Sequence, residues 1–85
     1  MPNFQANVSV SLRPSVLDPA GEAARSAASR MGIDGIHKLR IGKAVVLEIH
    51  AQDEKEARRK VELLADRLLA NPVIEDWTFD LSEVP

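Results

Sequence analysis

Apolar and polar side chains alternate along the N-terminal part of the chain. Between Phe4 and Leu12 every second residue is apolar, and glutamine, asparagine or serine occupies the positions between them. This period of two is typical of a half-buried β-strand, which turns one face to a core and the other to solvent. The pattern therefore predicts a first strand over residues 4–12.

The next segment, SVLDPAGEAA at residues 15–24, changes to a helical pattern. Asp18 suits the N-cap position, because its carboxylate accepts hydrogen bonds from free backbone amides, and Pro19 suits the first helical position. Gly32 can take the left-handed conformation that ends a helix. We predict a helix that begins at Pro19 and packs closely on a sheet through a face of small or flexible apolar residues: Ala20, Ala24, Ala27, Ala28 and Met31.

Two strand-like runs follow, IHKLRI at residues 36–41 and AVVLEIH at residues 44–50. Gly42 and Lys43 between them can form a two-residue hairpin turn. That register places Ile41 opposite Ala44 and leaves apolar side chains on both faces of the hairpin. Either a bulge near Gly42 removes this conflict, or something outside the chain covers the second face. We expect partial cover by a second copy, and therefore a homodimer.

The C-terminal half predicts a second helix and a last strand. Asp53 and Glu56 form a capping box, and the helix ends near Ala70 before the Asn71-Pro72 stop. Its apolar stripe consists of Ala57, Val61, Leu64, Ala65 and Leu68. VIEDWTFDL at residues 73–81 then alternates as a strand and carries two of the three aromatic residues.

The predicted order is strand, helix, strand, strand, helix, strand. Right-handed crossovers fold this order into a ferredoxin-like α+β two-layer sandwich, βαββαβ, with a four-stranded antiparallel sheet and both helices on one face. We expect a single domain over residues 1–85.

Composition narrows the possible partners. The chain has 85 residues, 45% of them hydrophobic and 28% charged, so it should fold around one small core. Its net charge of −2 gives no electrostatic reason to bind nucleic acid. It has no cysteine, and its start resembles neither a signal peptide nor a membrane span. We expect a cytoplasmic protein without membrane contact.

The sequence offers little for catalysis. A phosphate-binding loop needs several glycines and a lysine, whereas residues 15–24 contain one glycine and the capping Asp18. His37 and His50 are the only histidines and lack clustered partners for a metal. The serines lie in no nucleophile motif. We predict no catalytic residue, no cofactor site and no metal site.

Fold alone leaves other functions open. Ferredoxin-like domains also serve as acylphosphatases and as ligand-sensing regulatory domains. The stretch RPSVLDPAG lacks the glycine-rich anion loop that the hydrolases use, although Arg13 lies nearby. A stand-alone metabolite- or anion-binding domain therefore remains the alternative to an interaction domain.

Three separated blocks carry a resemblance: VSLRPSVLDPAG at residues 10–21, RIGK at residues 40–43, and LLANPVIEDW at residues 68–77. In this order they resemble the PurS family, the small subunits of multi-protein phosphoribosylformylglycinamidine synthase. The resemblance covers nearly the whole chain, from the first strand to the fourth.

The resemblance implies a function in de novo purine synthesis, as part of a ligase. A PurQ glutaminase subunit releases ammonia and a PurL synthetase subunit uses ATP and magnesium, while the PurS dimer bridges the two and supports ammonia transfer. The small subunit itself performs no chemistry and holds no cofactor.

From the resemblance and the turn positions we expect three cations to contact partner subunits: Arg13, Arg40 and Lys43. Long cationic side chains on rigid turns can reach a neighbouring protein, although they are equally suited to simple solvation.

Overall fold

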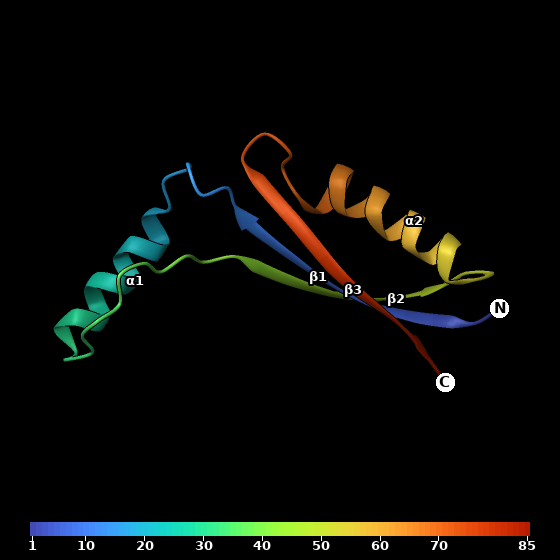
Figure 1. The fold of residues 1–85 in the computed structure, drawn as a ribbon, viewed down its shortest axis with the longest axis horizontal. Coiled ribbons are helices and arrows are strands. Elements are labelled where there is room, and N and C mark those ends of the chain that lie inside the picture. The colour runs from blue at the N-terminus through green and yellow to red at the C-terminus, as the bar shows by residue number, and fades with distance from the viewer.

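The computed structural model describes all 85 residues, Met1–Pro85. Its elements in chain order are β1 (Asn3–Leu12), α1 (Pro19–Arg30), β2 (Lys43–His50), α2 (Glu54–Leu64), the π-helical turn η1 (Ala65–Leu69) and β3 (Glu75–Val84). The molecule measures 52 × 29 × 14 Å, with the sheet and α2 at one end and α1 at the other (Figure 1).

The three strands form one antiparallel sheet in the order β2-β1-β3. Strand β1 lies in the centre and pairs along its length with both neighbours; Val8, for example, lies opposite Val45 on one side and Phe79 on the other. Because both edges of β1 are occupied, the outer edges of β2 and β3 have no strand partner in this chain.

The core lies between the sheet and α2. Alternate residues of β1 are fully buried there against Val61, Ala65 and Ala70. These β1 residues are Ala6, Val8 and Val10, and a second small cluster joins Phe4 to Ala51 and Ala57. The predicted strand pattern of β1 is therefore confirmed, and its asparagine and serine side chains lie on the face away from α2.

Both predicted helix starts are confirmed. The Asp18 carboxylate accepts from the Gly21 amide at 2.9 Å, and the Asp53 carboxylate accepts from the Glu56 amide at 2.8 Å. Helix α2 passes into the π-helical turn η1, and the chain leaves the helix at Ala70, as the sequence predicts. The last strand runs over Glu75–Val84, slightly later than predicted.

Helix α1 and the segment that runs back along it, residues 31–42, extend beyond the end of the sheet (Figure 1). We call residues 19–42 the arm. Gly21 is the only buried residue of α1. The prediction that the alanine face of this helix packs on the sheet is therefore wrong within a single chain.

The predicted fourth strand and its hairpin are also wrong for this chain. Residues 36–41 form no strand, and β2 begins at Lys43 and pairs with β1. The segment lies beside α1, where the Ile41 amide donates to the Asp18 carboxylate at 2.8 Å. The local pattern indicated an extended backbone but could not show that the helix would carry it away from the sheet. The structure confirms an α+β fold with two helices, but its antiparallel sheet has three strands instead of the predicted four.

We predict that Val8→Ala lowers the free energy of unfolding by about 1–3 kcal/mol, because it removes two fully buried methyl groups and leaves a cavity. Val46→Ala is the matched control, since Val46 lies on the sheet and is 66% exposed. Its effect should stay within about 0.5 kcal/mol. Urea unfolding followed by circular dichroism measures both, and equal effects would contradict the proposed core.

Candidate functional site

The arm joins the sheet at a junction centred on Asp18, which we call the elbow. One carboxylate oxygen of Asp18 accepts from the Gly21 amide, and the other accepts from the Ile41 amide. Asp18 is only 5% exposed, so water hardly competes for these bonds. The residue therefore does more than cap α1, because it also ties the returning segment to the start of the helix.

Two glycines allow the chain to cross closely at the elbow. A Cβ atom on Gly21 would overlap the carbonyl oxygen of Leu39, and one on Gly42 would overlap the carbonyl oxygen of Val10. These contacts are with backbone, which cannot swing aside as a flexible side chain can. A larger residue at either position would push apart the two backbone segments that cross there.

Arg13 fastens the elbow to the loop before β3. Its amide donates to the carbonyl oxygen of Ile74 at 2.9 Å, and its guanidinium donates to the carbonyl oxygen of Pro72 and pairs with Asp76 at 3.3 Å. Arg40 in turn donates to the carbonyl oxygen of Arg13 at 2.7 Å. The first and last thirds of the chain thus meet at this junction.

The elbow keeps Asp18 ionised. Hydrogen bonds from the Ile41 and Gly21 amides, assisted by the nearby charge of Arg40, hold the pKa of the Asp18 carboxyl below its ordinary value. A lowered pKa in the folded state means that the stabilisation is fully present above the unfolded pKa. It is lost as the pH falls through the folded pKa.

Glu22 and Arg25 form an exposed ion pair on α1, 2.9 Å long, which lowers the pKa of Glu22 and raises that of Arg25. Exposed pairs of this kind contribute little to stability. The pair gives no indication of a binding site.

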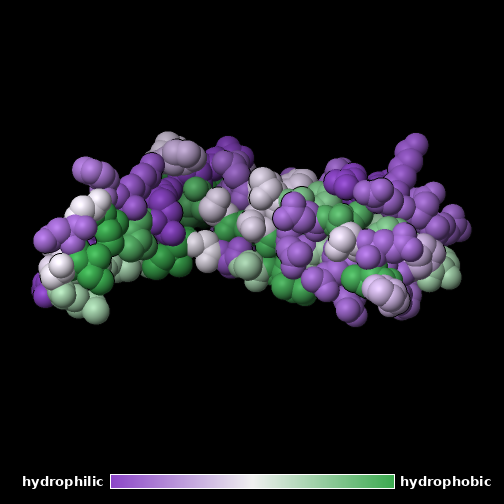
Figure 2. All heavy atoms as spheres, turned by 60° about the horizontal axis from the view of Figure 1, so that its bottom comes forward, coloured by the Kyte–Doolittle hydropathy of each residue, from purple (hydrophilic) through white to green (hydrophobic).

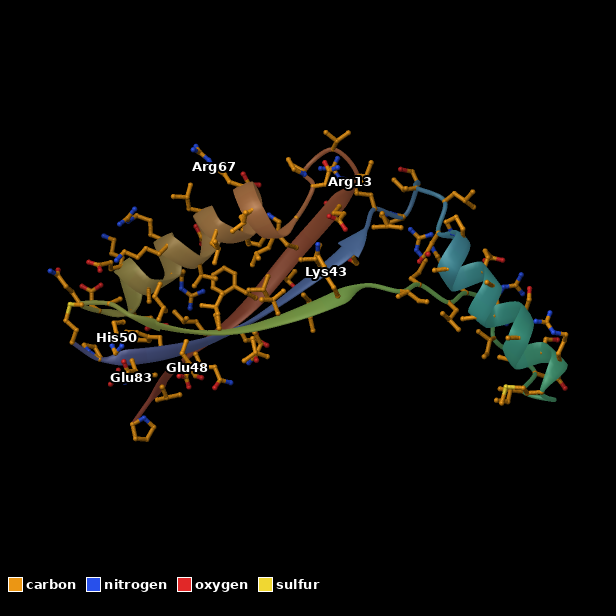
Figure 3. The ribbon with its side chains drawn as sticks, turned by 180° about the vertical axis from the view of Figure 1, so that it is seen from behind. Arg13, Lys43, Glu48, His50, Arg67 and Glu83 are labelled. Atoms are coloured by element: carbon orange, nitrogen blue, oxygen red, sulfur yellow. The ribbon has the colours of Figure 1, made fainter.

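The structure brings two of the three predicted contact residues together. Arg13 and Arg40 meet at the elbow, where both guanidinium groups bind backbone carbonyl oxygens of this chain. Lys43 begins β2 at the same end of the sheet and forms no ion pair (Figure 3). Their contact with a partner stays a prediction. Of the three side chains, only that of Lys43 forms neither a hydrogen bond nor an ion pair within the chain.

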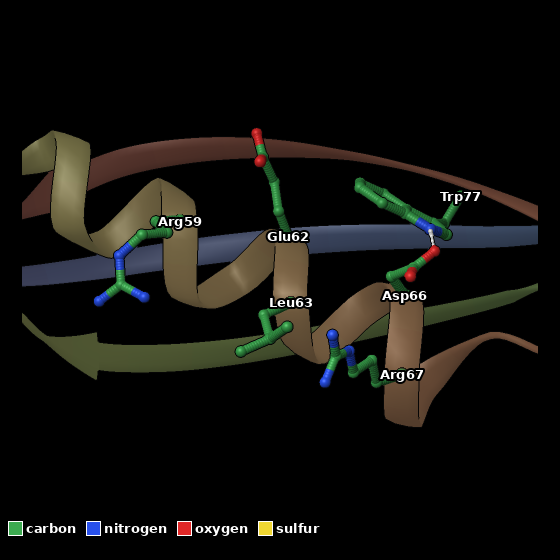
Figure 4. A pocket seen from close by; sticks show the side chains of 6 residues that line it. All are labelled: Arg59, Glu62, Leu63, Asp66, Arg67 and Trp77. Atoms are coloured by element: carbon green, nitrogen blue, oxygen red, sulfur yellow. Dashed lines mark hydrogen bonds between the residues drawn. The ribbon is translucent and has the colours of Figure 1, made fainter.

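A groove that the sequence reasoning did not identify runs along the outside of α2 (Figure 4). Its volume is about 390 Å³, and it is open to solvent. The lining residues are Arg59, Glu62, Leu63, Asp66, Arg67 and Trp77. The available signal was Leu63, an apolar residue within the charged outer face of the helix. Trp77 of β3 is only partly buried against the core.

The arm carries a second kind of surface. Its outer side is apolar, and Figure 2 shows hydrophobic residues gathered along this end of the molecule. Leu17 and Met31 are 73% and 75% exposed, and Ile33 and Ile41 about half exposed. Ala20 and Ala23 are also exposed on α1. Contiguous apolar surface of this kind marks an interaction site.

The side chains that could bind a metal ion do not form a cluster. No three histidine, cysteine, aspartate or glutamate side chains lie close enough together to hold a metal ion. His37 lies on the arm and His50 at the far end of β2 (Figure 3). No helix is both long and apolar enough to span a bilayer.

Comparison with known proteins gives one consistent family. A profile for PurS, described as phosphoribosylformylglycinamidine (FGAM) synthase, matches residues 5–83. The subunit PurS of Synechocystis sp. is 42% identical over 80 residues, which cover 94% of this chain and 80% of the relative. That of Mycobacterium leprae is 45% identical over 74 residues, 87% of this chain and 90% of the relative.

Solved structures agree. Thermus thermophilus PurS superposes with a TM-score of 0.88 at 32% identity, covering 99% of this chain and 100% of the other. A chain in the structure described as PurLQS from Thermotoga maritima gives a TM-score of 0.85 at 32% identity, with the same coverage.

We predict that Asp18→Asn loosens the elbow, because an amide side chain offers one acceptor oxygen where the carboxylate offers two. Hydrogen exchange at the Ile41 amide should become faster on the order of tenfold. Asp34→Asn, in the exposed turn at the tip of the arm, is the matched control and should leave this exchange unchanged.

In the unsubstituted protein the Ile41 amide resonance should titrate with an apparent pKa below the ordinary aspartate value of about 3.9. Unchanged exchange in Asp18→Asn, together with a titration at or above that value, would contradict the shared carboxylate.

Proposed function

The chain belongs to the PurS family and is a subunit of phosphoribosylformylglycinamidine synthase, and from this premise we propose how it serves that enzyme. It acts as a homodimer that bridges the PurQ-like glutaminase and PurL-like synthetase subunits and supports the transfer of ammonia between them. ATP and magnesium act in the synthetase subunit, and this chain supplies surfaces without reacting groups. We place the assembly in the cytoplasm.

One observation carries this proposal: the likeness to a chain of the Thermotoga maritima PurLQS structure extends over 99% of this chain. The alternative, a stand-alone metabolite- or anion-binding domain, is not favoured by any of the comparisons.

The uncovered surfaces support the homodimer. The outer side of the arm exposes Leu17, Met31 and Ile41 to water. On the sheet, Val45, Leu47 and Ile49 of β2 pack against the core but are only half buried. In a homodimer, the apolar side of the arm in one copy can cover the apolar residues of β2 in the other copy, and the reverse.

The predicted ferredoxin-like topology indicates how two copies fit. In that topology a strand over residues 36–41 pairs with the outer edge of β2, and the first helix lies beside the second. Here the β2 edge is free, and residues 36–41 lie on the arm. We propose that the arm of each copy provides this strand and helix to the other, so that the dimer contains two complete four-stranded sandwiches.

The bridging role predicts the behaviour of the reconstituted synthase. The chain alone should show no glutaminase, ATPase or synthetase turnover. Added to its glutaminase and synthetase subunits, it should restore glutamine-dependent synthesis, measured as formylglycinamidine ribonucleotide formed. Full glutamine-dependent turnover by the two large subunits without this chain would contradict the role.

The arm exchange predicts a charge-sensitive dimer. Ala23 is exposed on α1, on the same side as Ala20 and Ala27, and Ala23→Glu would place a carboxylate against the partner's sheet. Sedimentation velocity should show a dimer dissociation constant raised at least roughly tenfold. Ser29→Glu, at an exposed position on the opposite side of the same helix, is the control. Equal dimerisation of both variants, or a monomeric unsubstituted chain, would exclude the exchange.

A further inference from the structure

We propose that the outer edge of β3, the edge opposite β1, receives an extended segment of another synthase subunit, which adds a strand to the sheet and carries cationic side chains. The proposal rests on the bridging function and names one contact surface together with the chemistry of the partner segment.

The β3 edge offers a row of backbone groups that no strand of this chain pairs with. Opposed residues in an antiparallel pair alternate between those that exchange backbone hydrogen bonds and those that do not. The Arg13 amide donates to the carbonyl oxygen of Ile74 at 2.9 Å, and these two residues extend the β1–β3 register by one position. Every second residue of β3 after Ile74 therefore bonds to β1. The amides of the residues between them point away from β1, and we call the last four the outward amides: Trp77, Phe79, Leu81 and Glu83.

This edge is long and regular. Strand β3 pairs with β1 over ten consecutive residues without a bulge, and it contains neither proline nor lysine. Natural edge strands are commonly protected from pairing by one of these devices. On the side of the sheet toward α2, the apolar side chains of β3 are only half buried. An added strand would therefore gain both backbone hydrogen bonds and apolar contact.

Charge selects the kind of strand that fits. Strand β3 has no cationic residue and four acidic ones: Glu75, Asp76, Asp80 and Glu83. Of these only Asp76 forms an ion pair, with Arg13 at 3.3 Å. Arg58 lies over the ring of Phe79 but pairs with Glu54. Because opposite charges on neighbouring strands attract each other, the edge favours a segment with lysine or arginine.

Two carboxylates without an ion pair define the pattern of that segment. Asp80 lies opposite Asn7 and so shares the face of the sheet away from α2, whereas Glu83 lies opposite Phe4 and shares the face toward α2. A complementary strand carries one cation on each face, roughly 10 Å apart along the strand. Its remaining side chains on the α2 side are apolar, to match Phe79 and Leu81.

A second copy of this chain does not fit the β3 edge. Pairing β3 with β3 would bring together two strands that each carry four acids and no cation. The other free edge of a copy is that of β2, which the arm occupies in the proposed dimer. Since β1 separates β2 from β3, that dimer leaves the β3 edge open. Contact between copies and contact with the partner segment can therefore form together.

Amide hydrogen exchange tests the added strand directly. The full chain is mixed with its glutaminase and synthetase subunits, each alone and both together, and exchange is quenched and read residue by residue. Asp80→Lys tests the charge selection, with dissociation constants measured by surface plasmon resonance. Glu48→Lys is the matched control, because Glu48 is exposed, has no ion pair and lies on the same face of the sheet at the opposite edge strand. Sedimentation velocity verifies that both variants keep the oligomeric state of the unsubstituted chain.

We expect exchange at the outward amides to slow at least roughly tenfold in the complex. The amides of Thr78 and Asp80, which already bond to β1, should change less. Asp80→Lys should raise the dissociation constant at least roughly fivefold, more strongly at low salt, whereas Glu48→Lys should stay within about twofold.

Binding without this alternating protection, or with unchanged affinity in Asp80→Lys, overturns the proposal and leaves the bridging function intact. Protection of the outward amides that rises with the concentration of the chain alone would indicate a second copy at this edge and would also overturn it. Failure of the unsubstituted chain to bind either subunit would refute both this proposal and the bridging function.

Discussion

The shared carboxylate of Asp18 is the interaction on which the shape of this protein depends. One oxygen holds the start of α1 and the other holds the returning segment at Ile41, so the two passes of the arm leave the sheet as one unit. Arg13 and Arg40 extend this junction to the loop before β3. As a result, an alanine-rich helix that could have covered its own sheet is directed away from it.

Because α1 lies away from the sheet, the core of a single chain is small. Most of the fully buried side chains of this chain are alanine and valine, and the aromatic residues of β3 are only half buried. A domain of this size has little stability in reserve. Burying the outer side of the arm and the apolar face of β2 against a second copy would add the missing contact area, so we regard folding and dimerisation of this subunit as closely linked.

The sequence was informative where structure is decided locally and misleading where it is decided by distant parts. The alternation of β1 and the caps at Asp18 and Asp53 depend on neighbours along the chain, and the structure confirms them. The strand expected over residues 36–41 needed a pairing partner that no local pattern specifies. The groove was missed because Trp77, which lines it beside Asp66, comes from β3, and no local pattern shows which helix residue this side chain meets.

The central claim is that each copy completes the other through the exchanged arm. Isotope-filtered nuclear Overhauser spectroscopy on a mixture of labelled and unlabelled copies tests it most directly. The account predicts contacts between copies from the Ala23 and Ala27 methyl groups to the apolar side chains of β2, Val45, Leu47 and Ile49. A dimer in which these β2 side chains show contacts only within their own copy would contradict it.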